Sequence, residues 1–105
     1  WGLVCNEAAA CGVPAIVGDQ VGSADDLVVD GVTGWVYPTG DVSALARCIA
    51  QAASDPIDRA ERARQAKSHV FADYTVERSA DAIVELVLRM CGKSAPNQSR
   101  HAPVP

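Results

Sequence analysis

Residues 13–18 read VPAIVG, a short run without charged or hydrogen-bonding side chains and rich in β-branched residues. Such a run predicts a strand that is buried on both faces, as in a parallel sheet. Pro14 fits near the start of this strand, because proline has no amide hydrogen to donate to a central ladder. Residues 34–37, GWVY, predict a second short strand, which ends at Pro38.

Two short helices are predicted on either side of the first strand. Residues 1–12 are rich in alanine and end at Gly12, and glycine is typical of helix C-termini. Beyond the strand, Ser23 stands three residues before Asp26, a spacing that predicts a capping box. The helix that this box would open is expected to end at about Val29.

The second half of the chain is predicted to be helical. Asp41 is expected to cap one helix. Asp55 and Pro56 predict the start of a second, because the carboxylate caps and proline suits the first turn. A third helix is predicted over residues 75–91, with an apolar stripe along one face. Residues 93–105 contain three prolines and no apolar period, so we predict a disordered tail there.

The alternation of buried strands with helices predicts an α/β fold. We expect a partial, Rossmann-like doubly wound parallel sheet followed by C-terminal helices. Two strands are too few for such a sheet to stand alone. The chain also begins at Trp1 without a helix cap, so we expect the remaining strands upstream of it, in a longer protein. The open edge of so small a sheet could support self-association.

The amino-acid composition argues against several classes of function. The chain has 105 residues, 49% of them hydrophobic and 21% charged, which suits one small globular domain at most. Its formal net charge of −4 argues against a nucleic-acid partner. No apolar run approaches the roughly 18–20 residues that cross a bilayer, so we expect a cytoplasmic protein. The four cysteines form no C-x-x-C pair, and we expect small buried thiols with no metal site.

Glu7 is the first candidate functional residue, because it is the only charged side chain between Trp1 and Gly18. A carboxylate among apolar neighbours either faces water or needs hydrogen-bond donors. The hydroxyls of a sugar diol are suitable donors. An exposed acid on a helix face is the simpler interpretation, and the residues alone leave both open.

The start of the first helix is the second candidate. Amides at a helix N-terminus attract anions, and Gly2 would let a ligand approach the backbone closely. The amides of Gly2, Leu3 and Val4 would therefore suit a phosphate or a sugar.

Gly22 and Ser23 form a competing candidate, because they follow a buried strand at the usual ligand edge of an open α/β sheet. Asp25 and Asp26 in the next turn would repel a phosphate. Neutral hydroxyls, or no ligand at all, fit this position better.

Basic and histidine side chains of the later helices suggest no chemistry. Acidic residues interrupt the basic run, so we interpret it as a solvated helix face. His69 is expected to be a surface or packing residue. The run consists of Arg59, Arg62, Arg64 and Lys67.

Several segments together form a recognisable pattern: Trp1-Gly2-Leu3-Val4, Glu7-Ala8, residues 10–17, Val21-Gly22 with Asp26, residues 30–36, residues 38–41 and Ala44-Leu45. This pattern resembles the retaining GT-B glycosyltransferases of family 4, also called glycosyl transferases group 1. The resemblance is close over roughly residues 1–55. Ser23 stands where that family usually has a second loop glycine, and Asp26 replaces its usual glutamate.

The resemblance implies a donor site for a nucleotide-sugar. Glu7 matches the second of two family glutamates separated by seven residues, which implies hydrogen bonds to the ribose hydroxyls. The first glutamate would lie two residues before Trp1. Gly2, Leu3 and Val4 would present backbone amides to the donor sugar or diphosphate, with Gly22 and Ser23 as further loop contacts. No catalytic residue and no metal ligand is implied within this chain.

The expected function follows from the resemblance. Residues 1–92 would be the C-terminal half of a GT-B donor-binding domain, in an enzyme that transfers a sugar with retention from a nucleotide-diphosphate sugar to a glycan, lipid or small-molecule acceptor. We expect no cofactor and no required metal. The missing N-terminal part would be needed for activity, so the isolated chain is expected to be inactive, and the longer protein could associate peripherally with a membrane. A sugar-nucleotide epimerase of the same architecture and a non-catalytic interaction module are the alternatives.

Overall fold

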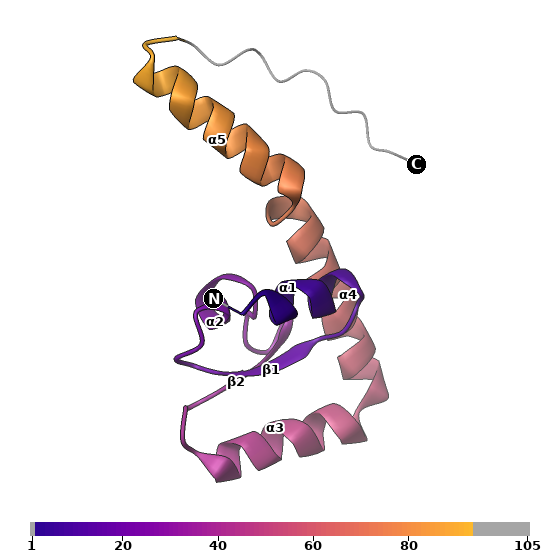
Figure 1. Cartoon of the computed structure of the whole chain (residues 1–105). Coiled ribbons are helices and arrows are strands. Elements are labelled where there is room, and N and C mark those ends of the chain that lie inside the picture. The colour runs from indigo at the N-terminus through magenta and orange to yellow at the C-terminus, as the bar shows by residue number, and fades with distance from the viewer. Residues whose placement is uncertain (1, 94–105) are drawn as a thin grey trace. The chain divides into compact units, whose positions relative to one another are not determined.

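The computed structural model describes residues 2–93, and the chain divides after Thr75 into two compact units. Trp1 and most of the predicted tail, residues 94–105, lie outside the described residues. Within residues 2–93, the first unit contains four helices and two strands and the second contains one helix (Figure 1). The elements of the first unit are α1 (Leu3–Ala10), β1 (Ala15–Gly18), α2 (Ser23–Asp26), β2 (Gly34–Tyr37), α3 (Val42–Ser54) and α4 (Pro56–Asp73), and that of the second is α5 (Val76–Met90).

The two predicted strands pair in parallel, which confirms the α/β fold class. Ala15 faces Gly34 in the register and Gly18 faces Tyr37. Helices α1 and α3 lie on opposite sides of the two strands (Figure 1). The core gathers where α1, β1, α2 and α4 meet, and consists of Cys5, Ala9, Val17, Ala24, Leu27, Val28, Ala66 and Val70.

The predicted caps of α3 and α4 are confirmed. Asp41 Oδ1 accepts a hydrogen bond of 2.8 Å from the Ala44 amide. Asp55 Oδ1 accepts from the amides of Ile57 and Asp58, at 3.1 and 2.9 Å, and Pro56 follows it as the first helical residue. These carboxylates satisfy amides that a helix leaves without internal partners. Helices α3 and α4 therefore begin where the local sequence predicts.

The capping box predicted at Ser23 is wrong. Gly22 is the N-cap of α2, Ser23 is its first helical residue, and the helix has no side-chain cap. The Ser23 side chain turns inward instead and is fully buried. No residue between 2 and 93 gives its hydroxyl a hydrogen-bond partner.

Helix α2 also ends at Asp26, earlier than the predicted Val29. The buried side chain of Thr33 explains this difference. Its Oγ1 donates to the Leu27 carbonyl at 3.1 Å and accepts from the Val29 amide at 2.8 Å. These backbone groups are thereby satisfied without further helical turns.

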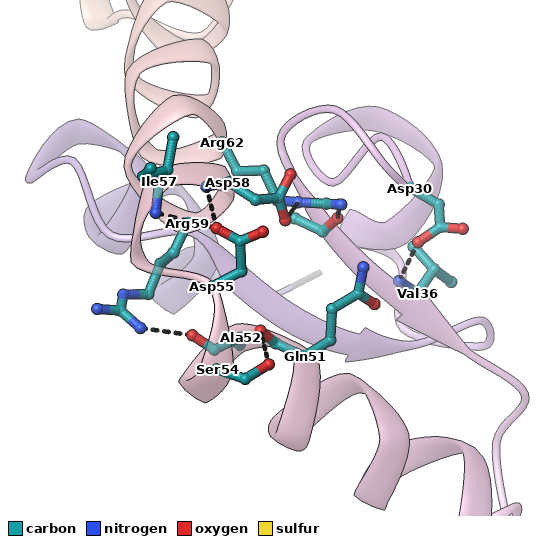
Figure 2. A network of polar contacts seen from close by, with 11 residues as sticks. Asp30, Val36, Gln51, Ala52, Ser54, Asp55, Ile57, Asp58, Arg59 and Arg62 are labelled. Atoms are coloured by element: carbon teal, nitrogen blue, oxygen red, sulfur yellow. Dashed lines mark hydrogen bonds and ion pairs between the residues drawn. The ribbon is translucent and has the colours of Figure 1, made fainter.

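The prediction that the basic run of α4 forms a solvated face is wrong for Arg62, which is only 7% exposed. Its guanidinium donates to the Gly34 carbonyl and to Asp58 Oδ2, both at 2.7 Å. The guanidinium carbon also lies 4.4 Å from the centre of a Trp35 ring. Figure 2 shows Arg62 and Asp58 side by side on α4, next to the strands. Arg62 therefore anchors α4 to β2.

The cysteines are less buried than predicted. Cys5 is buried and Cys48 is half-buried, but Cys11 and Cys91 are exposed, and all four are free thiols. Within residues 2–93 no three histidine, cysteine or acidic side chains are placed to hold a metal ion. No helix of the described part is both long and apolar enough to cross a membrane.

Helix α5, in the second unit, has the predicted apolar stripe. Arg89 and Glu85 form the i,i+4 ion pair that its sequence indicates. Most large apolar side chains of α5 are exposed, namely Val76, Ile83, Val84, Leu86, Val87 and Met90, whereas Leu88 is half-buried.

Candidate functional site

The N-terminus of α1 begins at a glycine in the left-handed region. Gly2 is its N-cap, with φ 88° and ψ 59°, and no side chain caps the helix. The side chains of Leu3 and Val4 are 65% and 68% exposed. The first amides of a helix have no carbonyl partner within it, and the helix dipole adds positive potential at this end. This terminus can therefore accept an anion.

The structure brings Gly2 and Ser23 together, although the sequence suggested two competing sites. A Cβ at Gly2 would lie 3.1 Å from Ser23 Oγ and 3.7 Å from a methyl group of Val21. The buried, unpartnered hydroxyl of Ser23 thus lies directly beside the residue that opens α1. A buried hydroxyl without a partner is costly in an apolar setting, and a ligand or an ordered water that bonds to it would remove that cost. The start of α1 and the loop at Ser23 therefore form a single candidate site.

Glu7 lies on α1, four residues beyond Leu3, and its side chain is exposed. At 1.5 Å of rise per residue, the two positions are about 6 Å apart along the helix. Among residues 2–93 the Glu7 carboxylate has neither a hydrogen-bond nor an ion-pair partner. Its oxygens are therefore available to hydroxyl donors.

A pair of hydrogen bonds that the sequence did not suggest holds the loop between β1 and α2. Asp19 Oδ1 accepts from the Thr39 amide at 2.8 Å, and Thr39 Oγ1 accepts from the Gln20 amide at 3.3 Å. These contacts join the carboxyl ends of β1 and β2, because Asp19 follows Gly18 and Thr39 follows the second strand. The only signal in the sequence is a polar residue shortly after each strand.

Acidification is expected to weaken the contact between Asp19 and Thr39. The hydrogen bond from the Thr39 amide holds the pKa of Asp19 below its ordinary value of 3.8. A folded pKa below the unfolded one adds stability at pH values above the unfolded pKa, and that stability is lost as the pH falls through the folded pKa. Hydrogen exchange of the Thr39 amide should accelerate in this acidic window, beyond the change expected for an unperturbed amide. Asp19→Asn should remove that pH dependence, and an unchanged profile in this variant would contradict the assignment.

The other end of α2 is held by His69 of α4 and by Tyr74, the residue that directly follows this helix. The Asp26 carbonyl accepts from His69 Nε2 at 2.7 Å and from the Tyr74 hydroxyl at 3.1 Å. The two rings are in contact, with their centres 5.4 Å apart. Burial, followed by the charges of Asp26 and Asp73, raises the pKa of Tyr74. His69, expected as a surface or packing residue, makes a specific backbone contact that sequence reasoning did not find.

A separate hollow of about 450 Å³ lies between the C-terminal side of α1 and the start of α4. Gly12, Pro14, Pro56 and Arg59 are among the residues that line it. Arg59 also donates to the Ala52 carbonyl, which joins α4 to the end of α3 (Figure 2). None of the candidate residues near Gly2 lines this hollow.

Comparison with known proteins identifies relatives of the chain. The family described as glycosyl transferases group 1 matches residues 1–69. Glycogen synthase of Mycobacterium tuberculosis is 33% identical over 88 residues, which cover 84% of this chain and 21% of that protein. D-inositol 3-phosphate glycosyltransferase of Kribbella flavida is 41% identical over 69 residues, or 66% of this chain and 16% of that protein.

A solved structure shares the fold. The sucrose-phosphate synthase from Thermosynechococcus elongatus superposes with a TM-score of 0.79 at 30% identity, over 88% of this chain and 23% of that chain. The chain thus spans about a fifth of the length of the first curated relatives that it matches.

Proposed function

Because the chain belongs to the glycosyl transferases of group 1, we propose that it forms part of the donor site of an enzyme that transfers a sugar from a nucleotide-diphosphate sugar to an acceptor, with retention of configuration. The names of its relatives support this proposal, since they include a glycogen synthase and a GDP-mannose-dependent mannosyltransferase. They also favour a transferase over the epimerase and the interaction module that the residues alone left open.

The observation that carries the proposal is the meeting of Gly2 and Ser23 at the start of α1. We assign the diphosphate to this end, where the amides of Gly2, Leu3 and Val4 would donate to its oxygens. Helix α2 is a poorer anion site, because it has only four residues and carries two carboxylates. Gly22 and Ser23 therefore act as loop contacts beside the diphosphate.

Glu7 completes the proposed site about one helical turn further along α1. An ionised carboxylate accepts two hydrogen bonds, so it would hold the 2′- and 3′-hydroxyls of the ribose. Hydrogen bonds to the ribose at one end of the nucleotide and to the diphosphate at the other would fix the position of the donor sugar relative to the acceptor. The amides at the start of α1 would also stabilise the charge that develops on the leaving diphosphate.

The remaining expectations stay predictions. Residues 1–92 are assigned to the nucleotide-sugar-binding domain. We further propose that the acceptor is a glycan, a lipid or a small molecule and that no cofactor or metal is required. We also propose a cytoplasmic location, peripheral membrane association and self-association through the sheet edge. No catalytic residue is assigned within this chain.

Replacement of Glu7 by glutamine is expected to weaken donor binding by about 10- to 100-fold, because hydrogen bonds to a charged group are worth about 1.5–3 kcal/mol. The measurement is a calorimetric titration of the longest natural polypeptide that contains residues 1–105, with GDP-mannose and UDP-glucose as separate probes. Glu77→Gln, on the exposed first turn of α5, is the matched control. Equal affinities for Glu7→Gln and the unmodified protein would reduce Glu7 to an ordinary surface acid.

A further inference from the structure

We propose that His69 and Tyr74 are positioning residues for the donor site, and that they act through the backbone of α2. Neither residue lies at the start of α1, and Tyr74 lies beyond the segment that the family matches. The inference rests on the proposed function, because it concerns how this chain holds the loop beside the diphosphate.

Helix α2 depends on contacts from outside itself. It has four residues and no side-chain cap, and one turn of helix has little stability of its own. Its last residue, Asp26, presents a carbonyl that the helix leaves without an internal partner. His69 and Tyr74 both donate to that oxygen, across more than forty residues of sequence.

The opposite end of the same segment is also held. Asp19 and Gln20 bond to Thr39 where the two strands end. Ser23 lies between these two attachments and contacts the position of Gly2. A displacement of α2 would therefore move Ser23 against, or away from, the residue that opens α1.

Helix α4 holds the other wall of the site as well. Its buried residues Ala66 and Val70 belong to the same core cluster as Cys5 and Ala9 of α1. Apolar packing thus places α1 on α4, and the His69 and Tyr74 hydrogen bonds place α2 on α4. The spacing between Gly2 and Ser23 follows from both contacts.

Conservative variants of His69 and Tyr74 distinguish a role in positioning α2 from a general contribution to stability. Tyr74 packs against the core, so its removal would disturb more than one hydrogen bond. Tyr74→Phe removes only the hydroxyl. His69→Leu removes the ring N–H, whereas His69→Gln keeps an N–H donor at a similar reach and serves as the conservative variant.

The test is donor affinity in the longest natural polypeptide that contains residues 1–105, measured by titration with GDP-mannose and UDP-glucose. The double variant His69→Leu/Tyr74→Phe is expected to raise the Kd about tenfold, as the loss of two neutral hydrogen bonds allows. His69→Gln/Tyr74→Phe should recover part of this loss. Lys67→Ala, exposed on α4, is the matched control and should bind like the unmodified protein.

Two further measurements test whether His69 and Tyr74 affect donor binding through α2 and Ser23. Amide exchange at Ser23 and Ala24 without ligand should accelerate in the double variant and remain unchanged in Lys67→Ala. In a Ser23→Ala background, the double variant should lose less affinity than it does with Ser23 present, because the two effects share one path.

The outcomes separate the two proposals. If the unmodified protein binds donor and the double variant binds equally well, the positioning role is wrong and the proposed function stands. A lower thermal stability of the double variant with an unchanged Kd would likewise contradict the positioning role alone. If the unmodified protein binds neither probe, the proposed function fails first, and the positioning role with it.

Discussion

Arg62→Met is expected to lower the free energy of unfolding of the first unit by about 2–4 kcal/mol. The substitution keeps an aliphatic side chain of similar length over Trp35 but removes every hydrogen-bond donor. The Gly34 carbonyl then loses its 2.7 Å bond from Arg62, and the Asp58 carboxylate loses its cationic partner. The Gly34 carbonyl keeps only its 3.2 Å bond from the Gly31 amide. This weakened pairing of a buried carbonyl and the loss of the partner of a half-buried carboxylate account for most of the cost.

Hydrogen exchange of the β2 amides as a function of urea is the appropriate measurement, because it reports on the first unit even within a longer polypeptide. Arg64→Met is the matched control, since Arg64 lies on the same helix and is exposed. Its partner Glu61, whose pKa the Arg64 hydrogen bond lowers to about 2, is also exposed, so this variant should change stability little. Equal effects of the two variants would contradict an anchoring role for Arg62.

Gly34→Ala is expected to be comparably damaging, at about 3 kcal/mol. An added Cβ would lie 2.3 Å from the Ala15 carbonyl oxygen and 2.8 Å from a methyl group of Val28. Neither neighbour can move freely, because Ala15 is the strand partner of Gly34 and Val28 is buried in the core. The strands would have to separate, which would also displace the carbonyl that Arg62 binds.

Gly31→Ala provides the comparison for Gly34→Ala. Gly31 has φ 77°, and a Cβ there would meet nothing within 4 Å, so this variant carries only left-handed backbone strain of about 1–2 kcal/mol. We expect Gly34→Ala to reduce exchange protection in both strands and to weaken donor binding, because the Asp19–Thr39 contact sits at the far ends of these strands. A smaller effect at Gly34 than at Gly31 would show that the strands are not packed as described.

The sequence predicted those strands and helix starts that depend only on residues close to them in the chain. The apolar run at residues 13–18, the cap at Asp41 and the Asp55-Pro56 start each depend on neighbours within a few residues. Their physical causes are strand burial, satisfaction of the first helix amides and the geometry of proline. Part of the candidate site has the same local character, because Gly2, Leu3, Val4 and Glu7 lie on one short helix.

The roles of other residues arise from contacts between segments that are distant in sequence. Arg62 reads as one member of a charged helix face, yet it is buried because β2 presents a carbonyl and an indole ring at its position. Ser23 reads as a helix cap but turns inward, against Gly2.

His69 and Tyr74 belong to the same class, because their acceptor on Asp26 is more than forty residues away. Apolar runs predicted the strands and local caps predicted the starts of α3 and α4, whereas helical and strand periodicity records only which residues share a face. Periodicity contains no information on which polar group from another element will meet that face. Packing in three dimensions made one site of Gly2 and Ser23 and placed the side chains that hold it.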